Sequence, residues 1–134
     1  GSGNDQFQNP TAIAIDKKGN IYIVDAGNRR LKKYDFSGNL IFIWSGHLQE
    51  PSHVALDQSG YLYITDRRSH SVKVLQNQGI EENNNQLVFA FGQQQLVDPT
   101  GIAISKHGKI FVSDSGANNI KVFQAIYTKQ AISN

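Results

Sequence analysis

Pro10-Thr-Ala-Ile-Ala-Ile-Asp16 is a stretch that this 134-residue chain repeats twice, as Pro51-Ser-His-Val-Ala-Leu-Asp57 and as Pro99-Thr-Gly-Ile-Ala-Ile-Ser105. Each copy continues into a second matching stretch, and these stretches end at Asp25, Asp66 and Asp114. The prolines and the aspartates recur at the same intervals, 41 residues and then 48. Self-similarity at such a period predicts a repeat architecture in which each copy is one structural unit.

Within a copy, short apolar runs alternate with turn residues. The first copy has four such runs, at residues 12–15, 21–24, 31–34 and 40–44. The Gly and Asn residues between them accept the positive φ angles of hairpin turns, so each copy is predicted to form four antiparallel strands. The first two runs are apolar at nearly consecutive positions, and both faces of each sheet therefore need cover. Four-stranded units of about 40–45 residues that cover one another around an axis form a β-propeller, so we predict an all-β propeller.

The copies resemble NHL repeats, a family whose pattern runs Pro-x-Gly-Ile-Ala-Val-Asp, then Gly-x-Ile-Tyr-Val-x-Asp, then a turn that ends Asn-His-Arg-Ile. The first copy is the most similar, through Asp25-Ala-Gly-Asn28-Arg29-Arg30-Leu31. The other copies depart from the last motif, with Ser69-His70-Ser71-Val72 and Ala117-Asn118-Asn119-Ile120. The resemblance covers about residues 7–123 and implies three NHL-type blades in one domain, at about residues 7–46, 47–92 and 93–134.

Three blades are too few to close a ring, because closed propellers have roughly 4–8 blades. Two interpretations remain open: two copies associate head-to-tail into a six-bladed ring, or the chain is part of a longer propeller. If two copies form the ring, the chain is expected to self-associate in solution. Residues 125–132 are a candidate for the last strand of the third blade. The polar residues 76–86, which lengthen the second copy, are expected to form a mobile loop.

Candidate binding residues gather on one rim of the predicted propeller. Because strand direction alternates, the hairpins between second and third strands lie on the same rim as the linkers between blades. That rim carries Arg29, Arg30, Arg67, Arg68, His70, Asn118 and Asn119, together with His47 and Glu50. The opposite rim carries Lys17, Lys18, Lys106, His107 and Lys109. The planar guanidinium of arginine suits carboxylate, phosphate and base recognition.

The resemblance implies that the arginine-bearing rim is a contact surface for proteins and, in some family members, for RNA. RNA recognition needs aromatic side chains on which bases stack, and no aromatic residue lies among these arginines. We therefore expect a non-catalytic binding or scaffold module that holds a protein partner, with RNA as the less favoured partner. A purely structural role in an assembly is a further alternative. Arg30 occupies the arginine position of the family and could instead hold a hydrogen bond between blades.

An enzymatic role is the alternative from another class. The resemblance extends to propellers that hold a metal in the central channel for lactone hydrolysis or lyase chemistry. His53, near the start of an innermost strand, is the best candidate ligand, but its equivalents are Ala12 and Gly101. Two chains would offer only two such histidines, so we predict no catalytic residue, metal or cofactor. Asp25, Asp66 and Asp114 are expected to accept amide hydrogens from the turn that follows each of them.

Composition narrows the class of the chain without naming a partner. A net charge of +2 is far from the excess of a dedicated nucleic-acid binder. Zero cysteines exclude disulfides and thiolate metal sites. No apolar run approaches the roughly 18 residues of a membrane span, and no secretory signal is visible, so we expect no membrane partner. The compartment stays open, with a slight preference for the cytoplasm.

Overall fold

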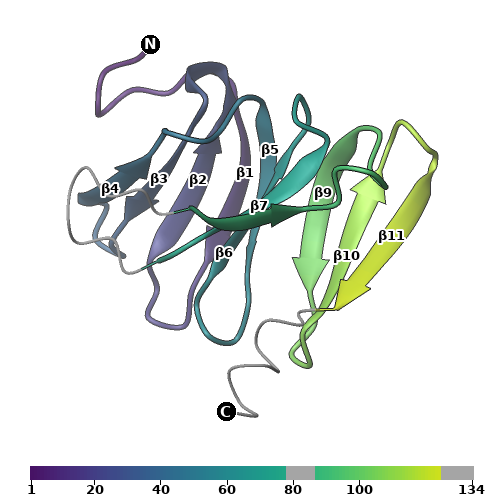
Figure 1. The fold of residues 1–134 in the computed structure, drawn as a ribbon. Helices are drawn as coiled ribbons and strands as arrows, with labels where there is room; N and C mark the ends of the chain where they lie inside the picture. Colours follow the sequence, from purple (N-terminus) through teal and green to yellow (C-terminus); the bar gives the residue numbers. More distant parts are fainter. Residues whose placement is uncertain (78–86, 125–134) are drawn as a thin grey trace.

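The computed structural model describes residues 1–77 and 87–124 of the chain, which form three antiparallel sheets (Figure 1). Blade 1 contains β1 (Pro10–Ile15), β2 (Ile21–Asp25), β3 (Arg30–Tyr34) and β4 (Leu40–Trp44), with a 3₁₀ turn at Ala26–Asn28. Blade 2 contains β5 (Pro51–Leu56), β6 (Leu62–Asp66), β7 (Ser71–Leu75) and β8 (Leu87–Phe91). Blade 3 contains β9 (Pro99–Ile104), β10 (Lys109–Asp114) and β11 (Asn119–Gln124). The candidate strand at 125–132 and most of the insertion at 76–86 lie outside the described residues.

Each sheet is a meander in which every strand pairs with its neighbour in sequence. The predicted strands of the first copy are confirmed, with β1, β2 and β3 each slightly longer than the apolar run that indicated it. The pairing register shifts at the same place in all three blades, beside Pro10, Pro51 and Pro99. The copies therefore share an irregularity as well as a strand order.

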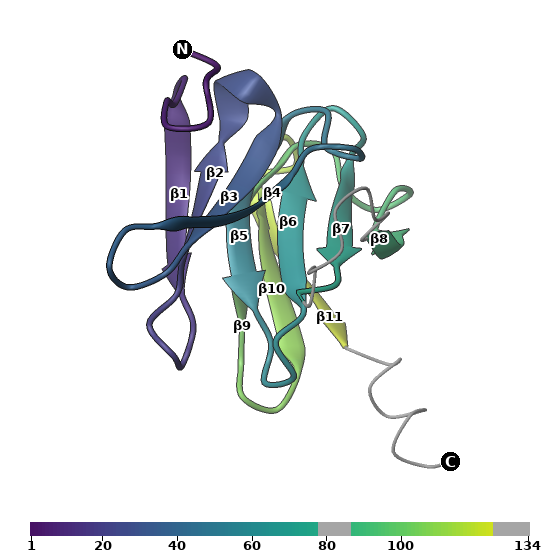
Figure 2. The same cartoon turned by 90° about the vertical axis from the view of Figure 1, so that its left-hand side faces the viewer.

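The three sheets lie face to face, with blade 2 in the middle (Figures 1 and 2). One core cluster joins blade 1 to blade 2 and includes Tyr22, Leu31 and Val54. The second joins blade 2 to blade 3 and includes Tyr63, Val72 and Ile102. β6 and β7 are buried along their whole length, as expected of a sheet that is covered on both faces.

The outer faces of blades 1 and 3 carry the same kinds of residue as the covered faces. Ile13 on β1 is 61% exposed, whereas its equivalent in blade 2, Val54, is 2% exposed. On the other side, Ile120 on β11 is 66% exposed, whereas its equivalents Leu31 and Val72 are fully buried. We call these the two open faces, because no described residue covers them.

The two rims of the molecule are built differently. The first hairpin of each blade is closed by a side chain that accepts backbone amides: Asp16 from Lys18 and Asn20, and Asp57 from Ser59 and Tyr61. Ser105 plays this part in blade 3. These hairpins form the lower rim in Figure 1, which we call the hairpin rim. The linkers before β1, β5 and β9 and the hairpins between second and third strands form the upper one, the linker rim.

A leucine three residues before its proline fills each internal junction. Leu48 is 5% exposed and packs in the cluster between blades 1 and 2. Leu96 is 4% exposed and packs in the cluster between blades 2 and 3. Both side chains therefore anchor a linker in the core between two blades.

Leu48→Ala should lower the free energy of unfolding by about 2–5 kcal/mol, because it leaves a cavity between two blades. Urea unfolding followed by the fluorescence of Trp44, which is buried in the same cluster, measures this loss. The control is Ile41→Ala on β4, where the side chain is 47% exposed and a smaller loss is expected. Equal losses in the two variants would contradict the role of Leu48.

Candidate functional site

The linker rim is held together by contacts between each linker and the hairpin of the blade that follows it. The backbone N–H of Arg67 donates to the carbonyl of Glu50 at 2.9 Å, and that of Ser115 donates to the carbonyl of Asp98 at 3.0 Å. In blade 1, Gly27 donates to Gln8 at 2.7 Å. Each linker is thus fixed to the hairpin of its own blade, and the predicted binding residues are placed on this base.

The repeated aspartates tie these linkers to the sheets. Asp25 accepts the amide of Gln8, and the carboxylate of Asp66 accepts the amides of Gln49 and Glu50. Asp114 accepts the amides of Val97 and Asp98 in the same way. The prediction that these carboxylates bind amide hydrogens is confirmed, but assigning those amides to the following turn was wrong. The amides belong to the linker about seventeen residues earlier, which becomes a neighbour only in the folded blade.

Each of these aspartates also binds a cation from the third strand of its blade. Asp25 pairs with Arg30 at 2.8 Å, Asp66 with Lys73 at 2.9 Å and Asp114 with Lys121 at 2.8 Å. The carboxylates of all three are essentially buried. Removing either partner would leave a buried charge without its counter-ion, which is strongly destabilising.

Burial alone would raise the pKa of these carboxyl groups. The linker amides and the third-strand cations outweigh it, so the pKa of Asp25, Asp66 and Asp114 lies below the ordinary value. For Asp114 the pKa falls to about 2. The three aspartates are therefore ionised structural groups and not a proton-transfer site.

Arg30 is a structural residue of blade 1. Its side chain is buried, and its guanidinium donates to Asp25 and to the carbonyls of Ser2, Gly3 and Gln6. These contacts all lie within the first blade and the N-terminal segment before it. Arg30 therefore does not form the hydrogen bond between blades that the sequence suggested. Arg30 does not contribute its charge to the surface of the rim.

Three equivalent residues at the tips of the linker-rim hairpins have left-handed backbone conformations. They are Arg29, His70 and Asn118, with φ angles of 55°, 55° and 58°. Such angles are uncommon outside glycine, and asparagine and histidine are among the residues that accept them. The His70 ring contacts the carbonyl of Val97 through Nδ1 at 2.7 Å, so this histidine braces the linker into blade 3.

The two arginines of blade 2 have different environments. Arg67 forms a two-point ion pair with Asp98 in the next linker, at 2.7 and 3.1 Å, and lies 3.8 Å from Glu50. Arg68 is exposed, as is Arg29 of blade 1. Within residues 1–77 and 87–124, the guanidinium groups of Arg68 and Arg29 have neither a hydrogen bond nor an ion pair. Asn119, beside the tip of the third hairpin, is exposed and accepts a hydrogen bond from Lys121.

His53 lies on β5, where its Nδ1 atom is buried and finds no hydrogen-bond partner among the described residues. A metal site needs several converging ligands. In the part of the chain that the structure describes, no three His, Cys, Asp or Glu side chains come together to hold an ion. The same residues contain no helix with the length and apolar character needed to cross a bilayer.

Comparison with known proteins identifies a known repeat in this chain. The sequence model of the NHL repeat matches residues 7–34 and 96–123. These two segments are NHL repeats. Residues 48–75 stand between the two matched segments, start 41 residues after the first and 48 residues before the second, and form β5, β6 and β7. No curated protein matches the chain by sequence.

Solved structures with the same arrangement are propeller-type proteins. Virginiamycin B lyase from Staphylococcus aureus is 12% identical with a TM-score of 0.69, over 92% of this chain and 43% of that one. Hydrazine synthase of Kuenenia stuttgartiensis is 20% identical with a TM-score of 0.72, over 93% of this chain and 36% of that one. The chain thus spans less than half the length of these structures. At such identities the likeness concerns the fold alone.

The buried aspartates predict how stability depends on pH. A carboxyl group whose pKa is lowered by folding stabilises the protein above its unfolded pKa, and that contribution disappears as the pH falls through the folded value. The free energy of unfolding should therefore fall between about pH 5 and pH 2. Asp66→Asn should lower it by about 3–5 kcal/mol at neutral pH, because it leaves the buried Lys73 without its counter-ion, and should flatten the acid limb.

Urea unfolding followed by Trp44 fluorescence at several pH values tests this prediction. The control is Asp5→Asn in the exposed N-terminal segment, whose profile should follow that of the unmodified chain. An Asp66→Asn profile as steep in acid as that of the unmodified chain would contradict the assignment.

Proposed function

We propose that this NHL-repeat chain is a non-catalytic binding module that holds a protein partner on its linker rim. The observation that carries the proposal is the pair of exposed arginines, Arg29 and Arg68, on equivalent hairpins of adjacent blades. Each lacks a carboxylate partner among the described residues. A rigid backbone supports both, because the linkers are tied to the hairpins beneath them.

The chemistry of the rim favours an acidic partner surface. The buried carboxylates of the rim are already paired with cations, and Asp98 is paired with Arg67. The remaining charge at Arg29 and Arg68 is therefore available for an incoming group. A planar guanidinium binds a carboxylate through two parallel hydrogen bonds, which gives orientation as well as attraction. The two hairpins, residues 26–29 and 67–70, contain no Phe, Tyr or Trp side chain on which an RNA base could stack.

We further propose that a second copy of the chain covers both open faces and closes a six-bladed ring. The face of blade 1 that carries Ile13 is equivalent to the blade 2 face that covers blade 1 in the internal junction. The face of blade 3 that carries Ile120 is equivalent to the blade 2 face that blade 3 covers. The open face of blade 1 therefore fits the open face of blade 3 in a second copy of the chain. Two chains would form two identical head-to-tail junctions around one axis.

Charge reversal at the rim tests the binding proposal. The double variant Arg29→Glu/Arg68→Glu should bind a hexaglutamate peptide at least about tenfold more weakly, measured by fluorescence anisotropy at low salt. The matched control Lys106→Glu/Lys109→Glu makes the same change of charge on the hairpin rim and should change the affinity less than twofold. Equal weakening in both doubles would contradict a specific site, as would tighter binding of oligouridine than of hexaglutamate.

Light scattering tests the second-copy proposal. The unmodified 14.9 kDa chain should have the mass of two chains. Ile13→Lys should reduce the mass to that of one chain, because it places a charge inside both junctions. Ile41→Lys on β4 is the control, since its equivalent in blade 2, Val88, stays 43% exposed although both faces of that blade are covered. A mass of one chain for the unmodified protein, or a mass that grows without limit, would contradict a closed ring.

A further inference from the structure

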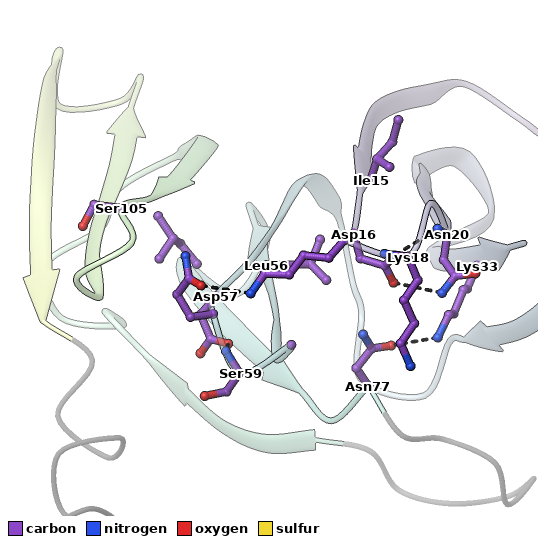
Figure 3. Close-up of a pocket in the computed structure, with 14 residues that line it drawn as sticks. Ile15, Asp16, Lys18, Asn20, Lys33, Leu56, Asp57, Ser59, Asn77 and Ser105 are labelled. Carbon is purple, nitrogen blue, oxygen red and sulfur yellow. Dashed lines mark hydrogen bonds between the residues drawn. The ribbon is translucent and has the colours of Figure 1, made fainter. Parts of the chain in front are cut away.

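A pocket of about 430 Å³ lies at the hairpin rim, whereas the arginines lie on the linker rim. Figure 3 shows the residues that line this pocket. The first hairpins of blades 1 and 2 form its walls, and Ile104 and Ser105 of blade 3 complete it. Lys17, Lys18 and Lys33 line it, and so does Asn77, which lies just after β7 of blade 2. The volume is within the range of small-molecule sites, which is roughly 300–1,000 Å³.

Lys33 is an exception to the repeat. It occupies the position on the third strand that is Val74 in blade 2 and Val122 in blade 3. Val74 is fully buried in the core between blades 2 and 3. The repeat therefore calls for an apolar residue at position 33, and blade 1 places a charged one there. Departures from an otherwise consistent pattern are expected at functional sites.

The ammonium of Lys33 is poorly compensated where it lies. It donates to Asn77 Oδ1 over a long distance of 3.4 Å and lies 5.4 Å from the centre of the Tyr22 ring. No carboxylate among the described residues forms an ion pair with it. Burial lowers the pKa of Lys33; Asp16 opposes this effect and the nearby ammonium of Lys18 adds to it. Two cations therefore approach each other in one pocket, an arrangement that an anion would stabilise.

The carboxylates that line the pocket are already engaged. Asp16 accepts two backbone amides, the side-chain amide of Asn20 and the hydroxyl of Tyr22 at 2.8 Å. Asp57 accepts two backbone amides and the hydroxyl of Tyr63 at 2.9 Å. Each thus serves its own hairpin and tyrosine. The charge that faces the pocket is mainly that of the lysines.

A hydrogen-bonded chain also fixes the orientation of Asn77. The Tyr22 hydroxyl donates to Asp16 and accepts from Asn77 Nδ2 at 2.8 Å. With its amide nitrogen held there, Asn77 presents its oxygen to Lys33. The lysine is therefore positioned across the junction of blades 1 and 2, and Figure 3 shows Lys33 and Asn77 meeting at one end of the pocket.

We propose that this pocket is a binding site for a small organic anion, whose anionic group lies against Lys33 and Lys18. Leu56 and Ile104 line the same cavity and offer apolar contact to the rest of the ligand. Lys17 donates to Gln58 at 3.2 Å, which holds it across the mouth between the two hairpins. The site lies on the hairpin rim and does not depend on the binding proposed for the linker rim.

Phenyl phosphate is the probe for this site, because it combines an anionic group with an apolar ring. Isothermal titration at constant ionic strength should show saturable binding to the unmodified chain. Lys33→Val, which restores the residue of the other two blades, should bind at least tenfold more weakly. The matched control Lys106→Val removes an exposed lysine of the hairpin rim outside the pocket and should bind within twofold of the unmodified chain.

Thermal unfolding gives a second readout that separates binding from folding. Without probe, Lys33→Val should melt above the unmodified chain, because it replaces a poorly compensated charge with a core residue. Phenyl phosphate should raise the melting temperature of the unmodified chain and leave that of Lys33→Val unchanged. The proposal is overturned if phenyl phosphate does not saturate, if Lys33→Val binds it within twofold, or if both lysine variants weaken it equally. Inorganic phosphate that binds as tightly as phenyl phosphate would overturn the apolar part of the site.

Discussion

The burial of one sheet face against the next is the constraint on which the rest of this structure depends. A four-stranded sheet with apolar residues on both faces is stable only when both are covered, and blade 2 is the sheet that meets this condition within the described chain. Tyr22, Leu31 and Val54 close one junction, and Tyr63, Val72 and Ile102 close the other. The same requirement leaves the outer faces of blades 1 and 3 as the natural place for another blade.

The buried ion pairs position the binding surfaces on this stack. Because Asp66 binds both the linker amides and Lys73, the path of the linker, the end of β6 and the middle of β7 are determined together. The exposed tips therefore project from a supported base, and Arg68 is held in the hairpin directly after Asp66. On the opposite rim the tyrosine–aspartate pairs have the equivalent role. They leave Lys33 beside an open pocket rather than in an ion pair with Asp16.

The sequence predicted what is local and what is periodic. Strand positions, hairpin turns and the two rims followed from apolar runs, glycines and the repeat interval. Contacts between residues distant in sequence were not predictable, such as the ion pair of Arg67 with Asp98 or the amides that Asp114 accepts, because the linker meets the hairpin only after folding. One signal was present and not used: alignment of the copies places Lys33 opposite Val74 and Val122. That mismatch is visible without a structure, although the pocket beside it is not.

Hydrogen–deuterium exchange of the unmodified chain over a thousandfold dilution tests most directly the claim that uncovered blade faces acquire a blade. Backbone amides of β6 and β7 are covered on both sides within the chain, so their exchange should not change with concentration. Amides of β1 and β11 should exchange slowly in concentrated solution and faster on dilution, because a second copy covers them by mass action. Exchange of β1 and β11 that is fast at every concentration would contradict the account, since their apolar faces would then remain uncovered.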